Sequence, residues 1–257
     1  MANEPNASRR TFLRRGLGAA GALLLAGCDR LTNTAWLPKV LGSAETLSRV
    51  AQRAITTRTS MAQEFAPEDR SPTFRSNGTS APADPRYQAL ADADFEPYLL
   101  QVSGLVAQPA TLTLTQVQAL PARSQITRHD CVEGWSAIAQ WRGAKLSALL
   151  AQVQPLPAAR YVVFYCADPM SGTDHRYYES IDMEDALHPQ TILAYELNGE
   201  PLPIENGAPL RLRVERQLGY KQAKYIMRIE LVDSFAAIAG GKGGYWEDRG
   251  YEWYAGI

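Results

Sequence analysis

The feature that most constrains the fold is a series of short β-rich segments separated by turns and by few, short helices. Residues 98–104 and 110–115 alternate apolar and polar side chains, as strands with one buried face do. Residues 161–166 form an uninterrupted apolar run, which is typical of a strand buried on both faces. Further strands are predicted at 125–128, 192–196, 210–215 and 225–232. This mixture predicts an α+β fold with a mixed sheet, and not a doubly wound sheet.

Short helices and turns are predicted between these strands. Thr115 is expected to cap a helix that ends before Pro121. A second helix is predicted over 146–153, where apolar side chains recur at helical spacing, and a third over 180–187. Turns are predicted at Trp141-Arg142-Gly143, Asn198-Gly199 and Asn206-Gly207.

The N-terminus carries a sorting signal. The run Ser8-Arg-Arg-Thr-Phe-Leu-Arg14 precedes an uncharged apolar stretch from Gly16 to Ala26, and this order resembles a twin-arginine export signal. The stretch is shorter than the roughly 20 residues of a spanning helix. We therefore expect export to the periplasm; the alternative is a basic pair that precedes an apolar helix by chance.

The apolar stretch ends in Leu25-Ala-Gly-Cys28, which resembles a lipoprotein cleavage box. This predicts an acylated Cys28 as a lipid anchor, and Asp29 resembles an inner-membrane retention signal. The alternative is an ordinary signal peptide that is cut elsewhere. Residues 1–28 are accordingly predicted to be the signal peptide, 29–72 a linker with a short helix, and 73–257 the functional domain, whose first twenty residues are irregular.

Charge and cysteine content exclude some classes of function. With 26 basic and 27 acidic residues, the net charge of -1 gives no general attraction to nucleic acid. Once Cys28 is assigned to processing, Cys131 and Cys166 remain. They could form a disulfide, but a chain of this size does not need one, and a free or metal-bound thiol is as plausible.

The densest group of ionisable side chains surrounds Cys131, in the run Arg128-His-Asp-Cys-Val-Glu-Gly-Trp-Ser136. Three interpretations are open from the residues alone. The thiol packs as a small hydrophobe; it is a nucleophile with His129 as its base, although no orienting third group is visible; or it is a soft ligand for a transition metal whose other donors are not protein groups. Nearby Arg128 favours the thiolate while Asp130 and Glu133 oppose it, so local charge does not decide.

A family resemblance distinguishes among these interpretations. The run Cys131-Val-Glu-Gly-Trp-Ser, followed by Trp141-x-Gly and Leu146-x-x-Leu-Leu, resembles the molybdopterin domain of the sulfite oxidase superfamily. The match continues through the runs that begin at Ala186, Asn206 and Leu218, and it covers about Phe74 to Val232. It is strongest to the branch that contains the periplasmic protein-methionine-sulfoxide reductase catalytic subunits. The implied fold is of sulfite oxidase type, without the C-terminal immunoglobulin-like dimerisation domain.

The resemblance also implies a cofactor and its site. The cofactor would be molybdenum-molybdopterin (Mo-MPT), with the metal bound by the thiolate of Cys131. Glu133 would handle protons next to the metal, or would form a structural salt bridge with Arg128. Cofactor contacts are implied for Asn77, Cys166, Asn206, Arg211, Lys221 and Lys224, whose cations suit a phosphate. Cys166 stands where the branch tends to have Thr, and Gln222 where it tends to have Gly; Cys166 contacts the pterin through its backbone or simply packs in its strand.

The expected activity is two-electron oxygen-atom transfer, in the form of S-oxide reduction on a small oxidised substrate or an oxidised protein side chain. True sulfite oxidases place arginines shortly after the metal cysteine, and these are missing here. Without a Cys-x-x-Cys-His haem motif, the chain is expected to need an external electron-transfer protein, either a membrane haem protein or a c-type cytochrome. The alternatives are sulfite-oxidase-like oxidation, a non-enzymatic lipoprotein that keeps the fold, and a cysteine hydrolase.

Overall fold

The computed structural model describes residues 47, 50–53, 57, 59–170 and 175–257. The internal contacts divide the chain into a unit Met1–Ala54, in which residues 47 and 50–53 are helical, and a unit Ile55–Ile257. The predicted export signal, the acylation site at Cys28 and the linker up to residue 46 lie outside the described residues. Among the described residues, no helix is both long and apolar enough to cross a membrane.

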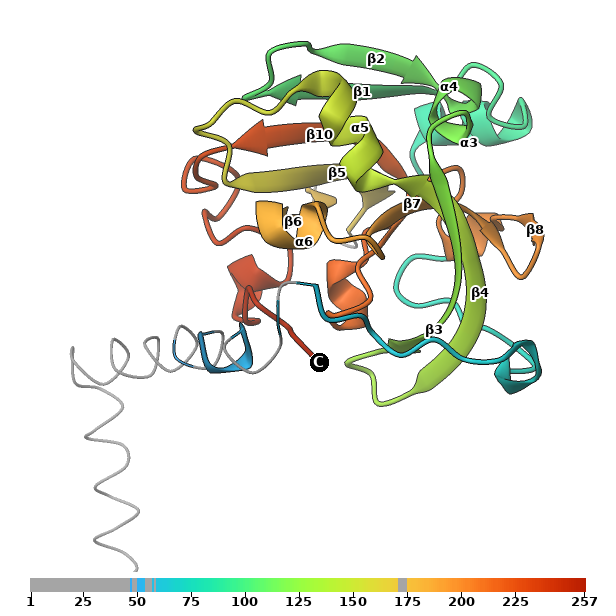
Figure 1. Cartoon of the computed structure of the whole chain (residues 1–257). Helices are drawn as coiled ribbons and strands as arrows, with labels where there is room; N and C mark the ends of the chain where they lie inside the picture. Colours follow the sequence, from blue (N-terminus) through green and yellow to red (C-terminus); the bar gives the residue numbers. More distant parts are fainter. Residues whose placement is uncertain (1–46, 48–49, 54–56, 58, 171–174) are drawn as a thin grey trace, which may run out of the picture. The chain divides into compact units, whose positions relative to one another are not determined.

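Two five-stranded sheets form the second unit (Figure 1). The first sheet has the order β2-β1-β10-β5-β6, in which β1 and β10 are parallel and the other pairs antiparallel. Its strands are β1 (Leu99–Gly104), β2 (Ala110–Thr113), β5 (Tyr161–Pro169), β6 (Arg176–Asp182) and β10 (Ile226–Val232). The predicted mixed sheet and α+β class are therefore confirmed.

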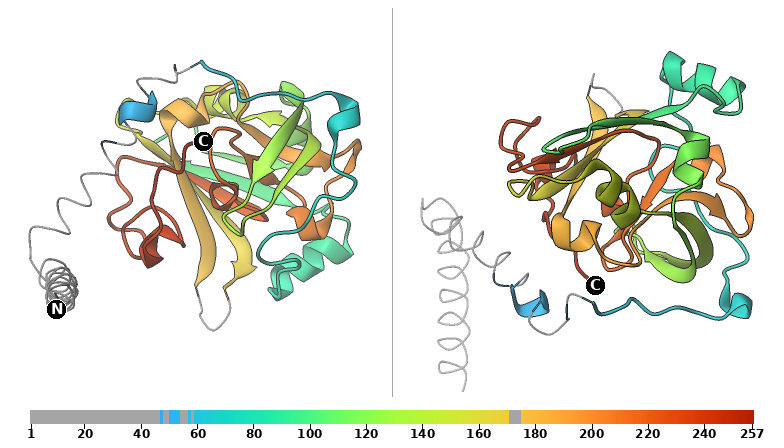
Figure 2. Two further views of the ribbon diagram at one scale, coloured as in Figure 1. Left: turned by 90° about the horizontal axis from the view of Figure 1, so that it is seen from below. Right: turned by 45° about the horizontal axis from the view of Figure 1, so that its top comes forward.

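The second sheet has the order β3-β4-β7-β8, with β9 also paired to β7. It comprises β3 (Ala122–Asp130), β4 (Ser136–Lys145), β7 (Ile192–Leu197), β8 (Glu200–Pro201) and β9 (Arg211–Arg213). The long β3–β4 hairpin curves along one side of the unit (Figure 2). Asn198 and Gly199, with φ of 54° and 89°, form the predicted tight turn between β7 and β8.

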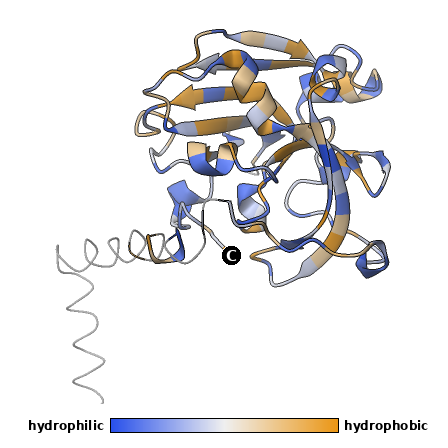
Figure 3. Cartoon of the chain, viewed as in Figure 1, coloured by the Kyte–Doolittle hydropathy of each residue, from blue (hydrophilic) through white to orange (hydrophobic). Residues whose placement is uncertain are grey.

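The helices are short. They are α3 (Pro85–Asp92), α4 (Leu114–Gln118), α5 (Leu146–Val153) and α6 (Met183–Ala186), with 3-10 turns η1 (Pro67–Asp69), η2 (Ile204–Asn206), η3 (Gly219–Lys221) and η4 (Glu247–Arg249). Helix α5 has its predicted bounds, and its apolar face packs into the main core with the buried residues of β1, β5 and β10. Figure 3 shows this as apolar colour on α5 and on the strands beneath it.

Three helix predictions need correction. The cap of α4 is Thr113 and not Thr115, because the Thr113 hydroxyl and the Gln116 amide form a reciprocal capping box. Helix α6 is capped by Asp182, and the residues before it, Ser180 included, extend β6. Helix α3 lies in the stretch predicted to be irregular: Asp84 accepts two backbone N–H bonds there, and Pro85 occupies the first turn.

The predicted turn at Trp141-Arg142-Gly143 is wrong, because all of these residues belong to β4. The register to β7 shifts between Arg142 and Gly143, where the two backbones come close together. A Cβ at Gly143 would lie 2.2 Å from the Leu193 carbonyl oxygen and 2.6 Å from the Ala194 Cα. The glycine therefore permits a close approach of strands and does not mark a reversal of the chain.

The substitution Gly143→Ala is expected to lower the free energy of unfolding by about 3 kcal/mol, because the new methyl group meets backbone that cannot rotate away. Urea-induced unfolding measures the change. The control is Gly199→Ala in the β7–β8 turn, where a methyl group meets nothing within 4 Å and only the positive φ costs about 1 kcal/mol. Equal losses in the two variants would contradict the close-approach explanation.

Candidate cofactor and active site

A cavity of about 210 Å³ opens beside Cys131. Its walls come from five parts of the chain that are distant in sequence: the segment before α3, the loop after β3, the adjoining ends of β5 and β6, the segment at η3, and the C-terminal segment. The lining residues are Asn77, Gly78, Thr79, Cys131, Val132, Glu133, Asp168, Met170, Tyr177, Gly219, Tyr220, Gln222, Lys224, Trp246 and Tyr251. The sequence-predicted Cys131, Glu133, Asn77 and Lys224 are therefore brought together.

Cys131 stands in a tight loop between β3 and β4. Its backbone N–H donates to the Trp135 carbonyl at 2.9 Å, and the Gly134 N–H donates to the Cys131 carbonyl at 3.0 Å. Gly134 adopts a φ of 85°, a conformation that favours glycine. Burial raises the pKa of the thiol, while the Glu133 backbone N–H and Arg211 act to lower it. The loop thus holds a largely buried thiol against the cavity.

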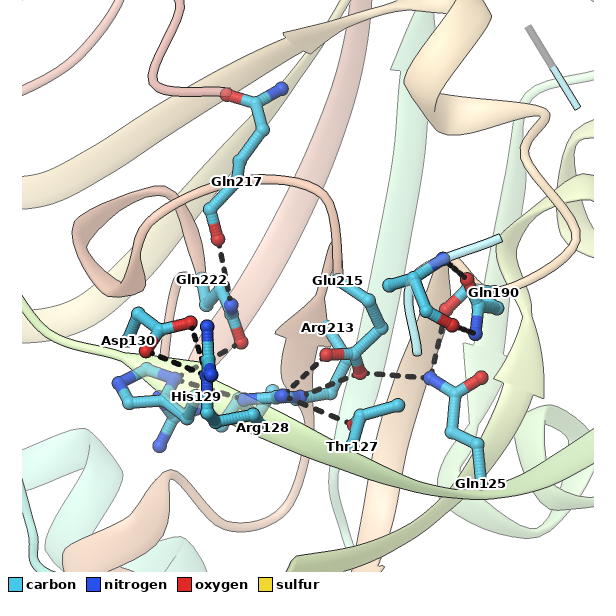
Figure 4. A network of polar contacts seen from close by, with 12 residues as sticks. Gln125, Thr127, Arg128, His129, Asp130, Gln190, Arg213, Glu215, Gln217 and Gln222 are labelled. Atoms are coloured by element: carbon cyan, nitrogen blue, oxygen red, sulfur yellow. Dashed lines mark hydrogen bonds and ion pairs between the residues drawn. The ribbon is translucent and has the colours of Figure 1, made fainter. Parts of the chain in front are cut away.

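A buried polar network anchors the strand that leads into this loop (Figure 4). The Arg213 guanidinium forms a two-pronged ion pair with Glu215, and both side chains are fully buried. Arg213 Nη1 also lies 3.0 Å from Nδ1 of His129, two residues before the cysteine. Burial, together with Arg211 and Arg213, lowers the pKa of His129 well below its ordinary value. Gln222 Oε1 lies 3.4 Å from the same imidazole nitrogen and links the network to the cavity wall.

Two cations, Lys224 and Arg211, fix the part of the cavity wall around Asn77. The Lys224 ammonium donates to the Asn77 carbonyl at 2.6 Å, to the Glu205 carbonyl at 2.9 Å and to the Thr79 carbonyl. Fully buried Arg211 donates to the Asn77 side chain at 3.3 Å and to the Asn206 carbonyl at 3.1 Å. Both cations therefore hold the segment around Asn77 in place.

Some buried polar atoms in this region have no hydrogen-bond partner within the described residues. In the part of the chain that the structure describes, Arg211 Nε, Asn206 Nδ2 and Asp168 Oδ1 are buried and have no hydrogen-bond partner. A buried polar atom without a partner costs about 1–3 kcal/mol, so such atoms commonly mark a binding site. Burial raises the pKa of Asp168 to about 6. These atoms offer donors and an acceptor to a ligand with a polar ring edge.

This donor set fits molybdopterin, the cofactor that the sequence resemblance implies. Its phosphate requires a cationic environment, which the buried charge of Lys224 and that of Arg211, whose Nε has no partner among the described residues, would provide. Its ring edges require amides and a carboxylate, which Asn77, Gln222 and Asp168 would offer. Within the described ranges, no group of three or more His, Cys, Asp or Glu side chains is arranged to hold a metal ion by itself. A metal at Cys131 therefore depends on other donors.

Four sequence-predicted contacts do not line the cavity: Cys166, Asn206, Arg211 and Lys221. Arg211 donates to the lining residue Asn77 and to the Asn206 carbonyl. The ammonium of Lys221 is fully buried and contacts the carboxylates of Glu179 and Glu247, and Lys221 does not line the cavity. The structure thus places Lys221 in a buried ion cluster. Cys166 packs in the main core, and it and Cys131 are free thiols, so the two form no disulfide.

The alternative role suggested for Glu133 is also corrected. Arg128 pairs with Asp130 at 2.9 Å, and not with Glu133. The Glu133 carboxylate instead accepts a hydrogen bond of 3.0 Å from the Trp135 indole N–H. This contact holds the exposed carboxylate at the open side of the cavity.

Sequence reasoning missed several lining residues, and two of them, Trp246 and Tyr251, lie on the C-terminal segment. That segment is rich in glycine and aromatic side chains. The segment packs on the body: the Tyr245 N–H donates to the Tyr178 carbonyl at 3.0 Å, and the Leu218 N–H donates to the Ala255 carbonyl at 2.9 Å. Trp246 and Tyr251 also line the cavity. No local sequence signal places them beside a cysteine more than a hundred residues away.

Comparisons with known proteins agree with this site. A family model described as an oxidoreductase molybdopterin-binding domain matches residues 87–237. The chain is 36% identical to a protein of Azospira oryzae that is named as a protein-methionine-sulfoxide reductase subunit, YedZ1, over 97% of this chain and 88% of that one. It is 39% identical to the protein-methionine-sulfoxide reductase catalytic subunit MsrP of Xanthomonas campestris, over 56% of this chain and 48% of that one.

Among solved structures, the sulfane dehydrogenase SoxCD from Paracoccus pantotrophus is similar with a TM-score of 0.49 and 24% identity, over 54% of this chain and 39% of that one. The family model spans more than half of the 257 residues, and it includes both the cysteine loop and the cation cluster. The chain therefore belongs to the family of oxidoreductase molybdopterin-binding domains, whose cofactor is molybdenum-molybdopterin.

Proposed function

We propose that this oxidoreductase reduces S-oxides by two-electron oxygen-atom transfer, with methionine sulfoxide in proteins as its substrate class. The observation that carries the proposal is a cavity lined by both Cys131 and Lys224, with fully buried Arg211 bound to the lining residue Asn77. The names of YedZ1 and MsrP, both methionine-sulfoxide reductase proteins, support the choice of substrate.

In this proposal the side chains divide into binding and positioning roles. Asn77, Asn206, Arg211 and Lys224 hold the cofactor, and Cys131 binds its metal. When bound, the molybdenum cofactor supplies two-electron redox chemistry coupled to the transfer of an oxygen atom. The tight loop between Cys131 and Trp135 fixes the backbone position of the cysteine, because two backbone hydrogen bonds close the loop.

The reaction consumes protons as well as electrons. A sulfoxide takes up two electrons and two protons, its S–O bond breaks, and the oxygen leaves as water. Glu133 stands at the open side of the cavity, where its exposed carboxylate exchanges protons with solvent. The electrons arrive from a separate electron-transfer protein, for which we propose a membrane haem protein or a c-type cytochrome.

The site of action follows from the N-terminal sequence. We propose that residues 1–28 direct twin-arginine export, that Cys28 can anchor the mature protein to the inner membrane, and that residues 73–257 form the catalytic domain. Residues before this domain also contact it: Glu64 forms a β-bridge with Thr127, and the Phe65 N–H donates to the Ile126 carbonyl at 2.9 Å. These contacts stabilise β3, the strand that precedes Cys131.

The test is to express the whole chain in a host that makes the molybdenum cofactor and to measure molybdenum content and turnover with a reduced dye as electron donor. We expect near-stoichiometric molybdenum and reduction of a peptide that contains methionine sulfoxide. Sulfite with an electron acceptor is the comparison substrate. A metal-loaded protein that oxidises sulfite but reduces no S-oxide would reverse the proposed direction, and a metal-free protein would favour a binding lipoprotein.

A further inference from the structure

Three aromatic rings meet on the cavity wall that the C-terminal segment forms. The rings of Trp246 and Tyr251 are stacked with centroids 5.3 Å apart and an interplanar angle of 30°. Tyr220, on η3, meets the Tyr251 ring edge to face at 5.2 Å and 89°. All three residues line the cavity that contains Cys131. We call this group the aromatic wall.

The aromatic wall is held in place from behind. Gly250, with a φ of 103°, lets the chain reverse so that the Tyr251 N–H donates to the Trp246 carbonyl at 3.0 Å. The Tyr220 hydroxyl donates to the Glu252 carbonyl at 2.6 Å. Beneath the turn, Glu247 is bound to buried Lys221 at 2.6 Å. The rings are therefore preorganised, and a ligand that packs on them does not have to order them first.

The wall reaches the open side of the cavity at Tyr251. Tyr251 is 41% exposed and Val132, which also lines the cavity, is 44% exposed, whereas Tyr220, Gln222 and Lys224 are buried. Large aromatic side chains that remain exposed beside a cavity commonly mark a surface that binds a ligand or a partner. The buried side contains the polar groups that suit the cofactor, so the rings remain available to a molecule that enters from solvent.

The charges at this opening disfavour an anion. Lys224 is the one cation among the lining residues that the structure describes, and its ammonium already donates to three backbone carbonyls. At the mouth itself stands the Glu133 carboxylate. A neutral group with apolar and polarisable parts suits this surface better than an oxyanion such as sulfite.

We propose that Tyr220, Trp246 and Tyr251 recognise the methyl sulfoxide end of an oxidised methionine side chain on a polypeptide. This inference rests on the proposed function and names the residues that select its substrate. Methyl groups and sulfur pack favourably on aromatic rings, and the sulfur of a sulfoxide carries partial positive charge that the negative ring face attracts. The exposed mouth leaves room for the main chain of the polypeptide to remain outside.

The decisive experiment measures binding without turnover. The oxidised, metal-loaded protein is titrated by calorimetry with a short peptide that contains one methionine sulfoxide, in the absence of any electron donor. Tyr251→Leu and Trp246→Leu are each expected to weaken binding roughly tenfold. Tyr251→Phe should restore near-wild-type affinity, because it keeps the ring. In steady-state assays the same variants should raise KM and leave kcat nearly unchanged.

A matched control is Phe235→Leu, which alters an aromatic contact with Tyr161 and Trp253 away from the cavity lining. Its affinity for the peptide should equal that of the wild type. The inference fails if the two leucine variants bind the peptide as the wild type does, or if their loss of binding follows a loss of molybdenum, which would mean that the rings hold the cofactor. A wild type that binds the peptide through these rings but reduces no S-oxide would refute the proposed function alone.

Discussion

A metal-loaded preparation of Cys131→Ala is expected to lose S-oxide reduction by more than about 100-fold. The loss of a residue that only supports a metal ligand lowers activity by about 10–100-fold, and Cys131 is proposed to be the ligand itself. Of the free thiols in the described part of the chain, Cys131 is the one that lines the cavity, and a thiolate is a soft ligand that suits a transition metal. Its removal leaves the metal without a protein sulfur, so the electronic spectrum of the metal should change together with the rate.

Two comparisons separate this effect from damage to the fold. Ser124 is exposed on β3, the strand that precedes Cys131, and Ser124→Ala should retain the wild-type rate, metal content and spectrum. Cys131→Ser should unfold at the wild-type urea midpoint and yet share the spectral change. If Cys131→Ala kept both the wild-type spectrum and a rate within a few-fold of wild type, Cys131 would not be the metal ligand.

The largest effect on stability is expected for Lys221→Met, at about 3–5 kcal/mol of unfolding free energy. The ammonium of Lys221 is fully buried between the carboxylates of Glu179 and Glu247, which are equally inaccessible. Methionine fills a similar volume but leaves these carboxylates without a cation. Because the cause is desolvated charge, the loss should be as large in metal-free protein as in the loaded protein, and urea-induced unfolding of both forms measures it.

The matched control is Arg142→Met, which breaks an ion pair with Glu196 at the surface. Exposed pairs contribute about 0–1 kcal/mol, so this variant should unfold near the wild-type midpoint. A loss in Lys221→Met that occurs only in the metal-loaded protein would restore the role of Lys221 as a cofactor contact.

The cluster of Lys221, Glu179 and Glu247 also predicts a pH dependence of stability. Burial and the neighbouring Glu247 raise the pKa of Glu179 well above its ordinary value of 4.5.

A carboxyl whose pKa is higher in the folded protein stabilises the fold fully below the unfolded value and loses that contribution as the pH rises through the folded value. The stability of the wild type should therefore contain a component that falls as the pH rises above about 4.5. In Glu179→Gln that component should be absent, because a neutral amide stands in for the protonated acid.

Local sequence patterns were sufficient where one short segment determines its own structure. The spacing of apolar residues gave the bounds of α5 correctly, and Asn198-Gly199 forms the turn that its two positive φ angles require. The patterns were insufficient where tertiary contacts dominate. Gly143 looks like a turn residue, but it lies inside a strand because the backbone of β7 occupies the space that a side chain would need.

The sequence by itself determined the α+β class and the family, because these depend on patterns of residues that are close together along the chain. Only the tertiary structure decided which distant side chains share the cavity. It placed Asp168, Trp246 and Tyr251 beside the cysteine and enclosed Lys221 between two carboxylates. The physical reason is that burial and charge pairing depend on what the folded chain brings together, and a lysine has the same local sequence signature whether it meets a phosphate or a buried glutamate.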